Sequence, residues 1–143
     1  MNRCFLIGHR DAPEEIIHEL KQIVKRLIAE EDVKEFIVGH YGKFDHLAAK
    51  AVAEVKREHQ EVRLTLLTPY HPAEKPPDAN GEYDESLYPF ERPVPPKTAI
   101  VQANQKAIQM SRHLIAYVCH PGKAREFLEY AQRRKIKIER VMQ

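Results

Sequence analysis

Short apolar runs and longer amphipathic stretches alternate along the chain. Residues 4–7 and 36–38 are continuous apolar runs, each ended by a glycine, which is typical of strands buried on both faces. Residues 16–28 carry apolar side chains at helical spacing and charged side chains elsewhere. Further strands are predicted at 64–67, 114–119 and 136–138, and further helices near 47–55, 98–111 and 127–131. The alternation predicts an α/β fold: a Rossmann-like, mainly parallel five-stranded sheet with helices on both faces, in one domain over residues 1–143.

Residues 69–97 interrupt this alternation. They hold eight of the ten prolines, together with the aromatic residues Tyr70, Tyr83, Tyr88 and Phe90. A long segment without regular structure inside a compact domain is usually a lid, a binding loop or a partner surface. A disordered excursion is the alternative, but its aromatic residues argue against it.

Charge and composition narrow the class of partner. The 23 basic residues are balanced by 21 acidic ones, and this near-neutral charge argues against a nucleic-acid partner. No apolar stretch approaches the roughly 18 residues of a membrane span. Cys4 and Cys119 both fall in runs predicted to be buried strands, which favours a reducing cytoplasm over a disulfide-bonded secreted protein.

Polar and glycine-rich turns follow four of the predicted strands. In an open parallel sheet, ligands bind beyond the carboxyl ends of the strands, where the strand order reverses. We therefore expect these turns to meet on one rim. They are Gly8-His9-Arg10, then Gly39-His40-Tyr41-Gly42-Lys43, then Pro69-Tyr70-His71-Pro72, and finally His120-Pro121-Gly122-Lys123.

This rim has the residue types that phosphate binding needs. Glycines allow a close approach to the backbone, and N–H groups at a helix N-terminus favour an anion. Gly39 and Gly42 precede the second helix, Lys43 adds a positive charge, and Arg10 adds a forked donor. The spacing is neither G-x-G-x-x-G nor a P-loop, so no dinucleotide or triphosphate motif is present. No cofactor is expected.

Two polar residues near this rim have alternative interpretations. Asp45 either hydrogen-bonds a sugar hydroxyl of a ligand or caps the second helix. Asn104 lies four residues after Ile100, on or near the buried face of its helix. Its side chain needs partners there, either backbone groups or a ligand.

Four histidines, His9, His40, His71 and His120, each follow a different strand, and imidazole is a common metal ligand. No pair of them has the helical i, i+4 spacing, and Cys119 is predicted to lie inside the sheet. We therefore predict no metal site. Polar contacts to a ligand, or histidines without a role on the rim, are the alternatives.

The chain resembles the SLOG superfamily (the DprA and Lonely-Guy proteins), and especially its small YpsA-like members. The resemblance covers nearly the whole chain and rests on four pieces in order: Gly8-His9-Arg10; Gly39-x-x-Gly42-x-x-Asp45-x-x-Ala48; Tyr88-Pro89 with Ala99-Ile100 leading to Asn104; and Ser111 with residues 114–118. It implies a nucleotide pocket lined by Gly8, His9, Arg10, Gly39, Gly42, Asp45 and Asn104. It is also compatible with a homodimer.

The resemblance implies three activities, because members of the superfamily sense nucleotides, hydrolyse nucleoside monophosphates or bind single-stranded DNA. Lonely-Guy enzymes carry P-G-G-x-G-T-x-x-E after the fourth strand. Here Pro121, Gly122 and Glu129 keep their places, whereas the other two glycines and the threonine are replaced. The leading expectation is thus binding or sensing of a nucleotide-type phosphate ligand. The alternatives are an N-glycosidic hydrolase with Glu129 as acid or base, a single-stranded DNA-binding module, and a protein-interaction module built on residues 69–97.

Overall fold

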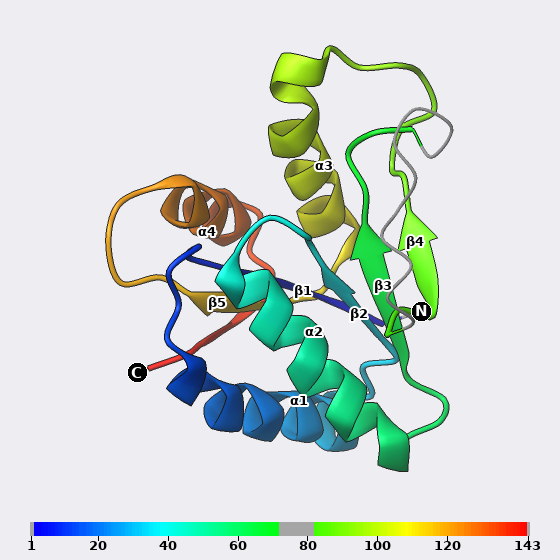
Figure 1. Ribbon diagram of the computed structural model, residues 1–143, viewed down its shortest axis with the longest axis vertical. Helices are drawn as coiled ribbons and strands as arrows, with labels where there is room; N and C mark the ends of the chain where they lie inside the picture. Colours follow the sequence, from blue (N-terminus) through cyan, green and yellow to red (C-terminus); the bar gives the residue numbers. More distant parts are fainter. Residues whose placement is uncertain (1, 72–81, 143) are drawn as a thin grey trace.

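The computed structural model describes residues 2–71 and 82–142, which form a parallel sheet with helices on both faces (Figure 1). The strands are β1 (Arg3–Gly8), β2 (Glu35–Val38), β3 (Arg63–Leu67), β4 (Glu85–Leu87), β5 (His113–Tyr117) and β6 (Lys137–Arg140). Their order is β4-β3-β2-β1-β5-β6, and every neighbouring pair is parallel. The predicted Rossmann-like α/β fold is confirmed.

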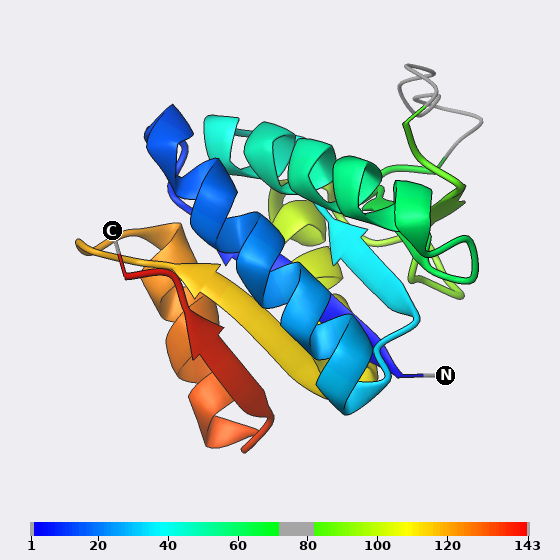
Figure 2. The same cartoon turned by 90° about the horizontal axis from the view of Figure 1, so that it is seen from below.

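The helices divide into two pairs, one on each face of the sheet. On one face lie α1 (Ile17–Glu31), entered through a 3₁₀ turn at Glu14–Ile16, and α2 (Lys43–Val55), which runs on into a second 3₁₀ turn at Lys56–Glu58. Figure 2 shows α1 and α2 side by side over the strands. The other face carries α3 (Pro96–Met110) and α4 (Lys123–Arg133).

Side chains of β1 alternate between two separate cores. Cys4 and Leu6 belong to the cluster under α1 and α2, whereas Phe5 and Ile7 belong to the cluster under α3 and α4. All four are at most 4% exposed. Because successive side chains of a strand point to opposite faces, a strand covered on both faces must be apolar throughout. This is why the run has no polar alternation.

The strand order reverses at β1. From β1 the chain builds outward through β2, β3 and β4, and then returns across α3 to place β5 on the other side of β1. Leu6 of β1 is paired with Ile115 of β5 in that central contact. The carboxyl ends of β1 and β5 therefore flank the topological switch point, where parallel α/β sheets usually hold ligands.

The sheet has six strands in the described residues, so the prediction of five is wrong. The missed strand is β4, which lies inside the 69–97 segment and pairs with β3. Thr68 donates a backbone hydrogen bond to the Leu87 carbonyl at 2.8 Å, and Asp84 donates one to the Leu64 carbonyl at 2.8 Å. Two of its three residues are exposed. A short, exposed edge strand buries too little apolar surface to leave a sequence pattern.

The 69–97 segment is thus partly built into the fold. Leu87 and Phe90 pack against the core under α3 and α4, and Tyr88 contacts Phe90 edge-on with ring centroids 5.4 Å apart. Helix α3 begins at Pro96, two residues before the predicted start. Residues 72–81 lie outside the described residues, and the choice between a lid, a partner surface and a disordered loop falls largely on them.

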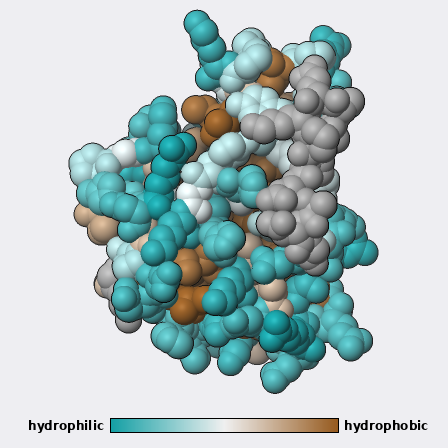
Figure 3. Space-filling view, in the orientation of Figure 1, coloured by the Kyte–Doolittle hydropathy of each residue, from teal (hydrophilic) through white to brown (hydrophobic). Residues whose placement is uncertain are grey.

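The surface seen in Figure 3 is mostly hydrophilic, with apolar side chains confined to small areas. Within residues 2–71 and 82–142, no helix has both the length and the apolar character needed to cross a bilayer.

The half-exposed edge strand predicted around residues 136–138 is confirmed as β6.

Candidate functional site

His9 joins the turn after β1 to the turn after β5. The side chain is 5% exposed, and its Nε2 accepts backbone hydrogen bonds from Cys119 at 2.9 Å and from His120 at 3.3 Å. An accepting Nε2 places the ring proton on Nδ1. Burial lowers the pKa of His9, nearby His120 lowers it further, and Asp11 opposes both. His9 is therefore a neutral imidazole that holds two strand ends together.

The turn after β2 packs directly on the turn after β1. The backbone N–H of Lys43 donates to the Arg10 carbonyl at 3.1 Å. A Cβ built on Gly42 would lie 2.9 Å from the Cα of Arg10, closer than real Cβ contacts come. Glycine at this position is therefore required by the approach of two backbone segments, whether or not a ligand is bound.

Close packing also explains why glycine occupies positions 8 and 39. A Cβ on Gly8 would lie 2.3 Å from the Phe44 ring, and one on Gly39 would lie 2.9 Å from Asp45 Oδ2. These glycines place the N-terminus of α2 against the sheet edge. Their residue type alone is thus no evidence for a phosphate.

Asp45 lies in the first turn of α2, beneath the turn formed by residues 39–42. Its Oδ2 accepts the backbone N–H of Tyr41 at 3.0 Å, whereas the N-cap residue is Gly42. Asp45 therefore satisfies a backbone donor in the turn that leads into α2, which is close to the capping interpretation. Burial raises its pKa to about 6, while the Tyr41 hydrogen bond, His40 and Arg10 each act in the opposite direction.

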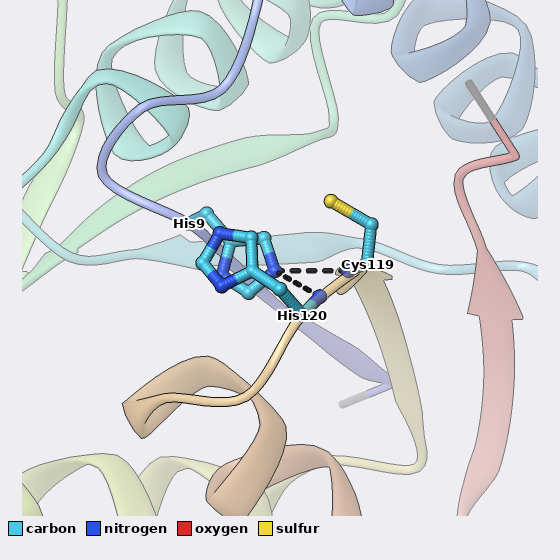
Figure 4. A group of neighbouring side chains, drawn as sticks. All are labelled: His9, Cys119 and His120. Carbon is cyan, nitrogen blue, oxygen red and sulfur yellow. Dashed lines mark hydrogen bonds between the residues drawn. The ribbon is translucent and has the colours of Figure 1, made fainter.

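The turn after β5 departs from the prediction at Cys119. Strand β5 ends at Tyr117, and Cys119 is exposed rather than inside the sheet. His120 stacks on His9 with ring centroids 3.6 Å apart and planes 9° apart (Figure 4). Pro121 is exposed, and Gly122 adopts φ 147°, a conformation that side chains rarely adopt, as the residue before α4.

Three of the four predicted turns, those after β1, β2 and β5, therefore meet at the switch point. Arg10, Gly42 and Lys43 form one contact, and His9 with His120 forms the next. Gly122 follows two residues later in the same turn. His40 and His71 lie in the turns after β2 and β3; His40 is exposed, with its ring edge-on to Tyr41, and the ring of His71 is edge-on to Tyr88.

The Asn104 side chain has a hydrogen-bond partner within its own helix. It is half-buried on α3, and its Nδ2 donates to the Ile100 carbonyl at 2.8 Å. This is a backbone partner, one of the two kinds that the sequence predicted. A role for its oxygen toward a ligand stays a prediction.

Glu129 faces a hollow of about 290 Å³ between α4 and the ends of β5 and β6. It lies 4.0 Å from Arg125, and both side chains are about half exposed. The lining residues are Val118, Cys119, His120, Arg125, Leu128, Glu129, Gln132 and Arg140. Sequence reasoning missed Arg125, Gln132 and Arg140, because the hollow needs the pairing of β6 with β5. His120 borders both the hollow and the rim.

No model of a protein family and no curated protein matches the chain. The fold and the rim by themselves define a parallel α/β protein whose candidate site lies at the carboxyl edge of its sheet.

Proposed function

We propose that the protein binds a nucleotide-type phosphate ligand on the rim at the carboxyl edge of the sheet. The observation that carries the proposal is the meeting of three turns at the switch point. Lys43 is tied to Arg10, and His9 is tied to Cys119 and His120, by the hydrogen bonds given above. Rigid turns that converge in this way supply a preorganised site.

The phosphate side of such a ligand would meet Arg10 and Lys43. Both are exposed. Lys43 Nζ lies 3.6 Å from Glu14 Oε1, and these two side chains are about half and three-quarters exposed. Exposed ion pairs contribute little free energy, so a phosphate can displace Glu14 at low cost. Arg10 supplies forked donors with the geometry that a phosphate accepts.

The base side of the ligand would meet an aromatic surface. One face of the His120 ring rests on His9, while half of the His120 side chain is exposed to solvent. Half-buried Tyr41 lies in the neighbouring turn after β2. Bases stack on exposed aromatic rings without requiring a sequence motif, so the combination favours a nucleotide over free phosphate.

Nucleotides, ADP-ribose derivatives and cyclic dinucleotides are expected to include a ligand that raises the melting temperature. At a free concentration about a hundred times its Kd, a ligand stabilises the fold by about 2.7 kcal/mol. Arg10→Ala should weaken that ligand roughly tenfold or more, because a charge-assisted hydrogen bond is lost. Thermal shift followed by calorimetric titration measures both effects.

The matched control is Arg112→Ala. Arg112 is also exposed, but it precedes β5 at the amino edge of the sheet, opposite the rim. Its replacement should leave the affinity unchanged. If no member of the panel stabilises the protein, or if both variants weaken binding equally, the rim is not the binding site.

A hydrolase is the second candidate, because Glu129 borders the hollow next to His120. A carboxyl group in such a position can act as a general acid or base in cleaving an N-glycosidic bond. If the protein releases base from nucleoside monophosphates, Glu129→Gln should lower the rate by about a hundredfold or more. Chromatography of the released base measures this rate.

Glu126→Gln is the control for this variant. Glu126 lies on the same helix, is exposed, and pairs with Lys123 rather than lining the hollow. A rate that falls equally in both variants, or in neither, would remove Glu129 from the reaction.

A further inference from the structure

Three side chains with metal-binding atoms gather where β1 and β5 end. His9, Cys119 and His120 each offer one ligand atom, and these atoms all lie within 4.8 Å of one another. Figure 4 shows the two imidazole rings in contact and the Cys119 side chain beside them. We propose that these three residues form a binding site for a zinc-type transition-metal ion. The sequence predicted no metal site partly because Cys119 was placed inside the sheet, and Cys119 is exposed.

The tautomer of His120 suits a metal ligand. Its Nδ1 lies 2.8 Å from the Pro121 carbonyl oxygen, which can only accept, so Nδ1 carries the proton. The lone pair on Nε2 is then available for a metal. Histidine ligands characteristically donate their other ring N–H to a backbone carbonyl in this way, which fixes the tautomer.

A carboxylate also faces the free nitrogen of His120. Asp11 Oδ1 lies 3.6 Å from His120 Nε2. With the proton on Nδ1, both of these atoms are electron-rich, and a cation between them would stabilise the pair. Asp11 is exposed and can adjust its position. It is the candidate for a fourth ligand, with water as the alternative.

The kind of ion follows from the donor atoms. A cysteine thiolate and two imidazoles favour zinc and other late first-row transition metals, whereas magnesium and calcium require oxygen ligands. The Cys119 Sγ lies 3.8 Å from the Tyr117 hydroxyl oxygen, within the range of a weak hydrogen bond. Three protein ligands with one adjustable position also match the coordination of catalytic zinc sites, which keep a position open.

Metal binding requires the stacked rings to separate. The two ring planes are only 9° apart, and the lone pairs that bind metals lie in those planes, so one ion cannot lie in both. His120 is the ring that must turn, because half of its side chain is exposed while His9 is 5% exposed. His9 would exchange the two backbone donors at Nε2 for the metal.

Metal binding and the proposed nucleotide binding use His9 and His120 in different arrangements, so each can be tested without the other ligand. The test therefore contains the full chain, a reducing agent that does not bind metals, and no nucleotide. Zn²⁺ titrated into the metal-free protein should bind with a stoichiometry of one ion per chain by calorimetry. Co²⁺ in place of Zn²⁺ should produce a near-ultraviolet thiolate-to-cobalt charge-transfer band, which reports a cysteine ligand directly.

The test uses variants of Cys119 and His120, because replacing these exposed side chains should not disturb folding. Cys119→Ser should abolish the charge-transfer band, and His120→Ala should weaken Zn²⁺ roughly tenfold or more. His18→Ala is the control, because His18 is exposed on α1 and outside the cluster. Far-ultraviolet circular dichroism verifies that each variant is folded. A protein that gives no charge-transfer band, or whose Zn²⁺ affinity survives both ligand variants, overturns the proposal.

Discussion

Gly8→Ala is expected to lower the free energy of unfolding by about 2–3 kcal/mol, one of the two largest effects on stability that we predict for this protein. The new Cβ would lie 2.3 Å from two carbons of the Phe44 ring, which is fully buried. Gly8 has an ordinary backbone conformation, so the cost comes from overpacking alone. Phe44 also lies parallel to the Tyr117 ring, with 6.5 Å between centroids, and belongs to the buried core cluster under α1 and α2. Urea denaturation measures the loss.

A double-mutant cycle separates this clash from other causes. Phe44→Leu alone should destabilise the protein, because it removes buried ring carbons. In the double variant the smaller side chain leaves room for the alanine methyl group, so the total loss should be less than the sum of the two single losses. Strictly additive losses, or a Gly8→Ala variant as stable as the unchanged protein, would contradict the packing explanation.

The second large effect is a pH dependence that arises from Asp45. Burial raises the pKa of this carboxyl from 3.8 to about 6. Between these two values the folded state binds more protons than the unfolded state, so stability falls as the pH rises. The stabilisation is complete below the unfolded pKa and is lost as the pH passes the folded one. At neutral pH, ionised Asp45 therefore costs about 1–3 kcal/mol.

Asp45→Asn removes this cost and retains an oxygen that can accept the Tyr41 N–H. The variant should be more stable than the unchanged protein at about pH 7.5, and the difference should vanish at about pH 4. Asp11→Asn is the control, because it removes a negative charge from the same rim at an exposed position. Chemical denaturation across this pH range measures both. A difference that does not depend on pH would show that the burial of Asp45 is not the cause.

Both of these effects on stability involve residues at the N-terminus of α2. Phe44 fixes this end of the helix against β1, and Asp45 binds the backbone of the turn that precedes it. The same turn carries Lys43, whose backbone is hydrogen-bonded to Arg10. Any change that moves the start of α2 should therefore also move the proposed phosphate contacts. Stability and ligand binding are linked there through packing.

The sequence alone determined the layered architecture. Apolar runs ended by Gly8 and Gly39, separated by an amphipathic helix, specify buried parallel strands with helical crossovers, because only that arrangement covers both faces of each strand. It also determined that the turns after the strands would share an edge. The parallel direction of all the strands makes this a consequence of the fold class rather than of any single contact.

Only the tertiary structure decided the details of the rim. Local pattern could not reveal β4, since its three residues are mostly exposed and gain their order from pairing with β3. Nor could it place Cys119 outside the sheet, because β5 ends where its pairing with β1 ends, at Tyr117 opposite Gly8. The packing role of Gly8 and the contact of His9 with residues 119 and 120 join positions far apart in the chain. Contacts of this kind depend on three-dimensional proximity, which residue spacing does not encode.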